Sequence, residues 1–304
     1  MDGYDIGAKR ETFIAPRDIV DGRLDLGGDG HKTLFCRTLI DTHDPYVPEE
    51  IVWPRLDDAA RARLVGLPIW SIAVDTEERA SINVLTYAET IGDPLVRRAT
   101  ELNGFEEARH RRLLARLVDA YAIEIPQAPP YPKPRDPEWA FMVTGYSECI
   151  DSFFAFGLFE LAKRSGYFPS ALVDVFEPIM QEECRHILFF VNWAAWHRRT
   201  MPWWRRPLFA AKVLAVWMFL IWERVKTARA VDGGSNFTMT GHASIDIDLD
   251  PAMLLEVCLA ENARRLARYD ARLVRPTIVP ALAGFARRLL GLRAVLARRQ
   301  PRGA

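Results

Sequence analysis

Two short segments of the chain repeat the same charged residues at the same spacing. Residues 106–110 and 182–186 both read Glu-Glu-x-Arg-His. In each segment a Glu precedes the His by three positions, which puts both side chains on one face of a helix. The pairs are Glu107 with His110 and Glu183 with His186. That face continues an apolar stripe, and an isolated buried carboxylate is very costly, so the pattern predicts a metal ion as the partner.

The two segments lie in residues 67–198, whose apolar periodicity predicts four helices. Gly92 and Asp93-Pro94 make a short turn between the first two helices, and Ser165-Gly166 ends the third. A Pro-rich connector, 125–137, joins the two halves. Short turns make antiparallel neighbours, so we expect an all-α four-helix bundle of two helical hairpins. The expected helices span about 69–91, 94–122, 138–164 and 170–197.

A site for two metal ions also needs one carboxylate from each of the other two helices. On the first helix, Glu77 lies at the centre of the apolar stripe, and Glu78, rotated by about 100°, is the alternative. On the third helix, Glu148 lies level with the repeated motif, and Asp151 on the same face is the alternative. The expected ligands are therefore Glu77, Glu107, His110, Glu148, Glu183 and His186.

Over residues 67–198 the chain resembles the ferritin-like di-iron superfamily. The paired motifs are similar to the Asp-Glu-x-Arg-His motifs of the bacterial multicomponent monooxygenases and the aerobic magnesium-protoporphyrin ester cyclases. The resemblance implies two iron ions on the six residues above, with a mixed manganese–iron pair as the alternative. It also implies that Arg109 and Arg185 support the site, and that the acid before each ligand Glu fixes the His of the other hairpin. Those acids are Glu106 and Glu182, one methylene longer than Asp.

The same resemblance implies an enzyme that activates dioxygen, a monooxygenase or oxidase. Its substrate would be a small, apolar organic molecule that is hydroxylated, desaturated or N-oxygenated, with electrons from a ferredoxin or a reductase. Leu114 stands where ribonucleotide reductase small subunits keep a radical Tyr, which argues against a radical-generating role. The alternatives are a ferroxidase or iron sensor without an organic substrate, and a metal-free helical interaction module. Thr144 and Ser152 flank Glu148 by one turn and either relay protons or only pack helices.

The regions on either side of the bundle are interpreted as additions to it. Residues 1–66 form an irregular arm in this interpretation, with one short strand at 33–40. Residues 199–304 add helices at about 201–230, 251–269 and 281–299 that pack on the bundle and end in a basic tail. The apolar stretch 207–222 has Trp near both ends, as interfacial anchors do, but it is shorter than the roughly 20 residues of a spanning helix. A fifth core helix is the first interpretation of this stretch.

Charge and composition limit the partners. The chain has 40 basic and 40 acidic residues, but residues 251–304 have 11 basic and 3 acidic ones. Zero net charge argues against a general nucleic-acid partner, while the basic tail fits an anionic membrane surface, an acidic partner or plain solvent. The apolar fraction of 49% excludes a disordered chain. A homodimer stays open.

Four scattered Cys without a CxxC, and a polar N-terminus without a signal peptide, favour a cytoplasmic protein, with the inner face of the membrane as an extension. The remaining His and Glu residues give no metal signal. His31, His43 and His242 are expected in loops, and Glu160 is too near the turn to reach the site. His197, Glu256 and Glu261 are expected to be structural.

Overall fold

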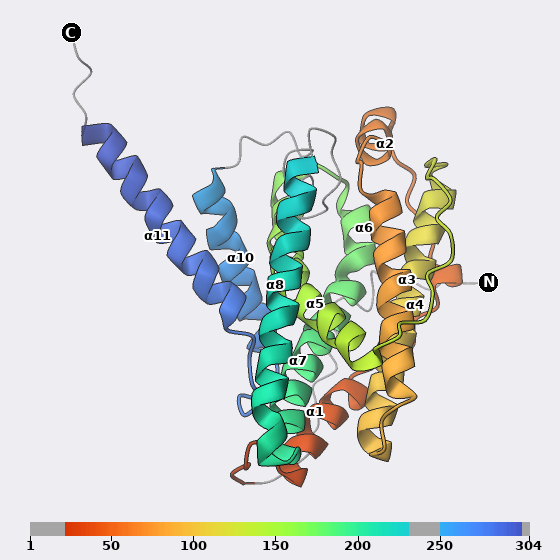
Figure 1. The fold of residues 1–304 in the computed structure, drawn as a ribbon. Helices are drawn as coiled ribbons and strands as arrows, with labels where there is room; N and C mark the ends of the chain where they lie inside the picture. Colours follow the sequence, from red (N-terminus) through yellow and green to blue (C-terminus); the bar gives the residue numbers. More distant parts are fainter. Residues whose placement is uncertain (1–21, 231–249, 300–304) are drawn as a thin grey trace.

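The protein is all-helical in this computed structural model, which describes residues 22–230 and 250–299, with side chains for 22–226 and 250–292; no strand occurs among them. Figure 1 shows the arrangement of the helices. The longer helices are α1 (Asp29–Asp41), α2 (Asp58–Val65), α3 (Trp70–Ala88), α4 (Pro94–Ala120), α5 (Pro137–Ser165), α7 (Glu177–Thr200), α8 (Arg206–Ala230), α10 (Pro251–Leu266) and α11 (Ile278–Arg299).

Helices α3, α4, α5 and α7 form the centre of the molecule, and local signals fix where they begin and end. Asp93 and Asp136 cap α4 and α5 by accepting hydrogen bonds from backbone N–H groups, and a Pro follows each cap. Gly166 ends α5 with a φ of 63°, a left-handed conformation that favours glycine. These boundaries agree with the sequence-based expectation to within a few residues.

Helix α7 begins later than expected. The expected helix from 170 is instead a short α6 (Ser170–Val173), a 3-10 turn η3 (Asp174–Phe176) and then α7, which has Pro178 in its first turn. A Pro has no N–H to donate and is favoured in the first turn of a helix. Pro178 therefore marks the start of α7 as a helix separate from α6.

Aromatic side chains of α3, α5 and α7 pack against one another in the core. Tyr87 of α3 stacks on Phe141 of α5 at 4.5 Å between ring centroids, and Trp193 of α7 meets Phe141 edge-on at 4.7 Å. Gly145 on α5 lets Phe190 come so close that a Cβ there would lie 2.2 Å from the ring. This packing fixes the register between α3, α5 and α7, which carry Glu77, Glu148 and the second motif.

The N-terminal segment is more regular than the sequence suggested. Residues 33–40, expected as a short strand, lie inside helix α1, and residues 58–65 form α2, so the interpretation of 1–66 as an irregular arm is wrong for these two stretches. Leu34, Phe35 and Leu39 of α1 are buried and join the core of the central helices. The β-rich composition of α1 is overridden because its apolar side packs on α4 and α7.

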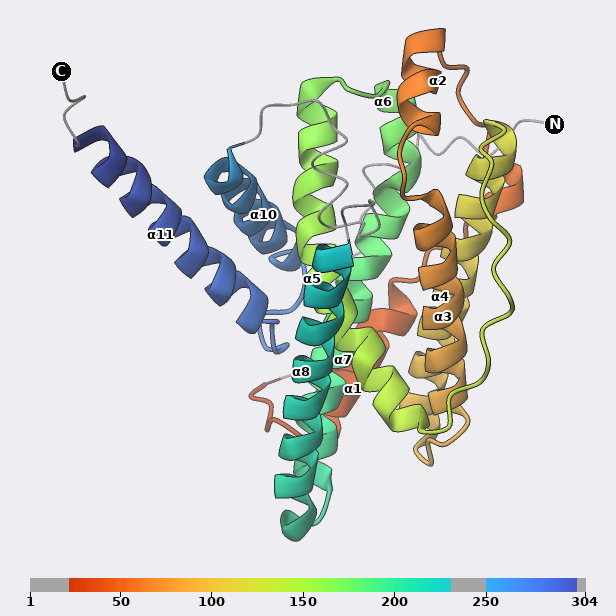
Figure 2. The same ribbon diagram turned by 45° about the horizontal axis from the view of Figure 1, so that its top comes forward.

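The C-terminal helices add an outer layer. Helix α8 packs along α5, α10 also packs on α5, and α11 packs on α10. In both views α11 diverges from the rest of the molecule toward the C-terminus (Figures 1 and 2). Among the described residues, no helix combines the length and apolar composition needed to cross a bilayer.

Candidate metal centre

All six residues expected as ligands come together between α3, α4, α5 and α7. They form two groups in each of which one ligand atom per residue lies within 4.8 Å of the others. The groups are Glu77, Glu107, His110 and Glu183, and Glu107, Glu148 and His186. Glu107 belongs to both groups, so the arrangement matches two neighbouring metal positions that share a carboxylate.

Two carboxylates lie between the imidazoles. Glu107 places Oε1 at 2.7 Å from His186 Nδ1 and Oε2 at 3.8 Å from His110 Nδ1. Glu183 places Oε1 at 3.4 Å from His110 Nδ1 and at 4.0 Å from His186 Nδ1. Carboxylates in this position can bridge two ions, whereas Glu77 and Glu148 each face one group and suit terminal ligands.

The donor set fits a pair of divalent cations. The Nδ1 atoms of His110 and His186 and one oxygen each of Glu107 and Glu148 are buried and make no hydrogen bond, although His186 Nδ1 and Glu107 Oε1 lie 2.7 Å apart as an ion pair. Buried polar atoms rarely lack hydrogen bonds, so these four atoms are suited to bind metal ions. Four carboxylates and two neutral imidazoles carry four negative charges, which two divalent ions would balance.

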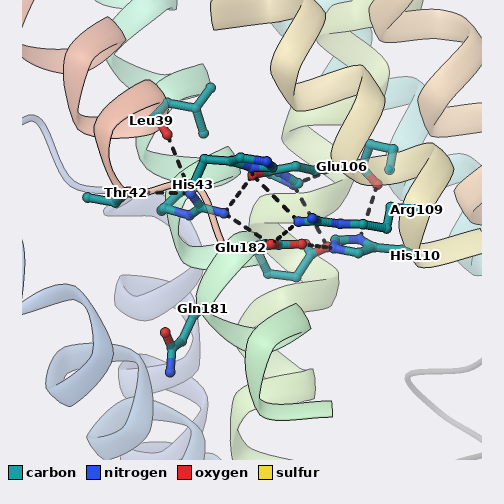
Figure 3. A network of polar contacts seen from close by, with 12 residues as sticks. Leu39, Thr42, His43, Glu106, Arg109, His110, Gln181 and Glu182 are labelled. Atoms are coloured by element: carbon teal, nitrogen blue, oxygen red, sulfur yellow. Dashed lines mark hydrogen bonds and ion pairs between the residues drawn. The ribbon is translucent and has the colours of Figure 1, made fainter. Parts of the chain in front are cut away.

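The second nitrogen of each imidazole is fixed from the opposite hairpin. His110 Nε2 lies 2.7 Å from Glu182 Oε2 (Figure 3), and His186 Nε2 lies 2.7 Å from Glu106 Oε2. The longer Glu side chains therefore make the crossed contacts that the motif implied. This leaves both Nδ1 atoms directed to the centre, since a carboxylate on one nitrogen fixes the orientation of a ligating His ring.

The two motif arginines cross between the hairpins in the same way. Arg109 donates to Glu182, and Arg185 Nη2 donates to Glu106 Oε1 at 2.8 Å. Both arginines are buried, so each offsets the charge of a carboxylate that has left water. Burial alone would raise the pKa of Glu106, but Arg185 and the hydrogen bond from His186 hold that pKa well below its usual value.

The N-terminal segment closes this outer ring of charges, which the sequence did not reveal. His43 Nδ1 lies 2.5 Å from Glu106 Oε1, and Arg109 donates to the carbonyl oxygens of Asp44 and Tyr46 (Figure 3). The Arg109 guanidinium also stacks over the Tyr46 ring at 3.9 Å. A single His in a loop 63 residues from its partner has no periodic signal, so only the fold could bring it here.

The alternative ligands lie outside the cluster. Glu78 lies 3.5 Å from Arg111 in an ion pair. Asp151 accepts hydrogen bonds from Ser147 and from Arg224 of α8. Neither acid belongs to any of the three groups that could hold a metal ion, the third being His43, Glu106 and Glu182, so the geometry favours Glu77 and Glu148 over them.

The two hydroxyls beside Glu148 have different partners. Ser152 donates to Glu183 Oε2 at 2.8 Å, so it touches the cluster. Thr144 accepts a hydrogen bond from Asn83 of α3 and joins two helices. Of the two hydroxyls that flank Glu148, only that of Ser152 therefore contacts the cluster.

The remaining polar candidates have structural partners. His31 lies in α1 rather than in a loop and pairs with Asn192, and His197 pairs with Glu138. Glu256 is bonded by Arg287, and Glu261 by Arg264. Glu160 is bonded by Arg164. His242 lies outside the described residues.

The carboxylates of the cluster are less deeply buried than its imidazoles. The side chains of Glu77 and Glu183 are 20% and 12% exposed, while those of His110 and His186 are 0% exposed. Burial raises the pKa of Glu77 to about 8, and burial together with the charges of Glu107 and Glu183 raises that of Glu148. Protons thus balance the excess acid charge in the metal-free chain, and a metal ion would displace them.

No family model, no curated protein and no solved structure matches this chain.

Proposed function

We propose that the chain is an oxidoreductase with a carboxylate-bridged di-iron centre that activates dioxygen to oxidise a small organic substrate. One observation carries the proposal: Glu107 belongs to both metal-binding groups, and each group contains one His whose Nδ1 is buried and makes no hydrogen bond. A shared carboxylate with one imidazole per position is the ligand pattern of the di-iron and di-manganese carboxylate proteins.

The donor types favour iron over the other common ions. Four carboxylates with two imidazoles make an oxygen-rich set with little nitrogen and no thiolate. Zn²⁺ in proteins prefers four ligands rich in sulfur and nitrogen, so this set suits zinc poorly. All four cysteines are buried and free, and none belongs to a metal-binding group. A mixed manganese–iron pair suits the same donors and is the second candidate.

The ferritin-like four-helix bundle is part of the proposal. Helices α3 and α4 form one hairpin and α5 leads through a turn to α7, with the connector 121–136 between the hairpins. Each hairpin supplies one Glu from its first helix and a Glu-x-x-His pair from its second, as in the ferritin-like carboxylate proteins.

The protein side of the reaction follows from the same contacts. The bridging and crossed carboxylates hold the imidazoles at fixed angles, and the buried His side keeps water away. Glu77 and Glu183 occupy the partly exposed side, where dioxygen and substrate approach. When bound, two ferrous ions would supply electrons to dioxygen, and a ferredoxin or reductase would restore them. Ser152 holds one oxygen of Glu183 and so sets which way that carboxylate turns.

Metal analysis with matched variants tests the centre. The protein loaded with ferrous iron without dioxygen should hold close to two ions per chain after gel filtration. Glu77→Gln and Glu148→Gln should each lose metal, whereas the neighbouring Glu78→Gln and Asp151→Asn should retain it. Equal retention in all four variants would reject the site, and circular dichroism checks that each variant is folded.

Dioxygen consumption by the iron-loaded protein tests the reaction class. We expect a panel of small apolar compounds to contain one that accelerates dioxygen uptake and is recovered with an added oxygen atom or a new double bond. Uptake that depends only on ferrous ion, with ferric mineral as the sole product, would make the protein a ferroxidase instead.

A further inference from the structure

The outer face of α8 is apolar and exposed. Its large exposed side chains each have 37–67% of their surface in solvent. They are Leu208, Leu214, Met218, Phe219, Ile221, Trp222 and Val225. So many large apolar side chains exposed along one helix are a feature of interaction sites rather than of ordinary surface.

Helix α11 presents a second apolar stripe. Ile278, Leu282, Phe285, Leu289 and Leu292 recur at intervals of four and three residues, and each is 44–62% exposed. Val279 and Ala283 on the adjacent face are buried, so α11 packs one side on the molecule and leaves the stripe free. The apolar sector is therefore wider than its packing on α10 uses.

Positive charge accompanies both surfaces. The sequence of α11 has five Arg and no acidic residue. On α8, Lys212 and Arg224 face the bundle in ion pairs with Glu138 and Asp151, so they do not interrupt the outer face. The exposed cations stand at its two ends, with Arg205 beside Trp203 and Trp204 before the helix and Lys226 near its other end.

We propose that the apolar faces of α8 and α11 bind the surface of an anionic lipid bilayer. Apolar and Trp side chains enter the boundary between headgroups and acyl chains, and flanking Lys and Arg contact the acidic headgroups. A second copy of the chain fits less well. The sequence of α11 has five Arg and no acidic residue, so an anionic surface complements its charge, whereas a second, equally basic α11 would oppose it.

Sedimentation with vesicles tests the proposal on the full chain. Vesicles of phosphatidylcholine alone are compared with vesicles that contain one third phosphatidylglycerol. We expect binding to the anionic vesicles at least tenfold tighter than to the neutral ones, and weaker in high salt because the charges are screened. Equal binding to both kinds, or none to either, overturns the proposal.

Matched variants locate the binding face. Met218→Gln with Trp222→Gln, and separately Leu282→Gln with Phe285→Gln, should each reduce binding to anionic vesicles at least fivefold. Val52→Gln is the control, because Val52 lies outside α8 and α11 and its side chain is 72% exposed. This variant should bind vesicles as the unchanged protein does. Metal content and circular dichroism confirm that the variants are folded.

Sedimentation equilibrium separates the competing occupant. A monomer without lipid supports membrane binding. A dimer that dissociates in the Met218→Gln, Trp222→Gln variant, with no vesicle binding by the unchanged protein, assigns the face to a second copy and overturns the proposal. Neither result bears on metal content, so the proposed di-iron function stands or falls separately.

Discussion

His110 and Glu182 are 72 residues apart in the chain, yet the imidazole Nε2 and the carboxylate Oε2 lie 2.7 Å apart. The equivalent contact, with the roles of the two hairpins exchanged, joins His186 and Glu106. Each imidazole of the candidate centre is therefore oriented by the hairpin that does not carry it. Both hairpins are therefore needed to orient the two imidazoles. Substitutions of Glu106 and Glu182 test the site as directly as substitutions of the expected ligands do.

Glu182→Gln should weaken metal binding without removing a ligand. The amide loses the negative charge that orients His110 and deprives Arg109 of its closest carboxylate. Loss of such an outer contact typically lowers metal affinity by about 10–100-fold. Competition with a chelator of known affinity measures the change. Glu101→Gln, at an exposed position of α4, is the control and should keep the original affinity.

His43→Gln should destabilise the protein even before metal is added. It removes a contact to the buried, ionised Glu106, and a hydrogen bond to a charged group is worth about 1.5–3 kcal/mol. Urea denaturation of the metal-free protein measures the free energy of unfolding. Lys133→Gln breaks an exposed ion pair with Glu89 and should change that energy by less than about 1 kcal/mol. Equal effects of the two variants would show that the N-terminal segment does not brace the site.

Gly145→Ala should destabilise the fold, whereas Gly284→Ala should not. The added methyl at position 145 would overlap the Phe190 ring, and overpacking of a core costs about 1–3 kcal/mol. Nothing lies within 4 Å of a Cβ at position 284 in α11, where Ala is favoured over Gly by about 0.5–1 kcal/mol. Thermal melting of both variants checks the opposite signs.

Glu138→Gln should change how stability depends on pH. The hydrogen bond with His197, against the opposing effect of burial and with the help of Lys212, lowers the pKa of Glu138 to about 2. A lowered folded pKa stabilises the protein above the unfolded pKa of about 4.3, and this contribution is lost as pH falls toward 2. The variant should therefore lose stability at pH 6 and lose less than the parent between pH 4.5 and 2.5. Because Glu138 is one-third exposed, the difference should not exceed about 1 kcal/mol.

The sequence predicted those features that repeat with the period of a helix. Glu107 and His110 are three residues apart on a strongly apolar stripe, so their common face followed from spacing alone. The choice of Glu77 over Glu78 rested on the same periodicity. The structure places these residues together because the helix ends, marked by Asp93, Asp136 and Gly166, put the acids at matching heights.

Features built from single, distant residues could not be predicted in this way. His43 and Tyr46 reach the site from a loop, and their positions depend on how α1 packs on α4 and α7. Residues 33–40 of α1 were expected as a strand, and their Thr, Phe and Ile residues do favour strands locally. The burial of α1 against two helices outweighs that local preference.

The crossed carboxylates also constrain how the chain can fold as it is made. Glu106 emerges from the ribosome 79 residues before Arg185 and 80 before His186, which neutralise it in the finished protein. Until then only His43 and Arg109 among its partners have been made, so much of its charge has to remain hydrated, because burying it without the rest is very costly. A hairpin of α3 and α4 alone therefore cannot complete its core during synthesis. The central helices are expected to fold as one cooperative unit after α7 has been translated, so truncation before α7 should leave a chain that is degraded rather than half-folded.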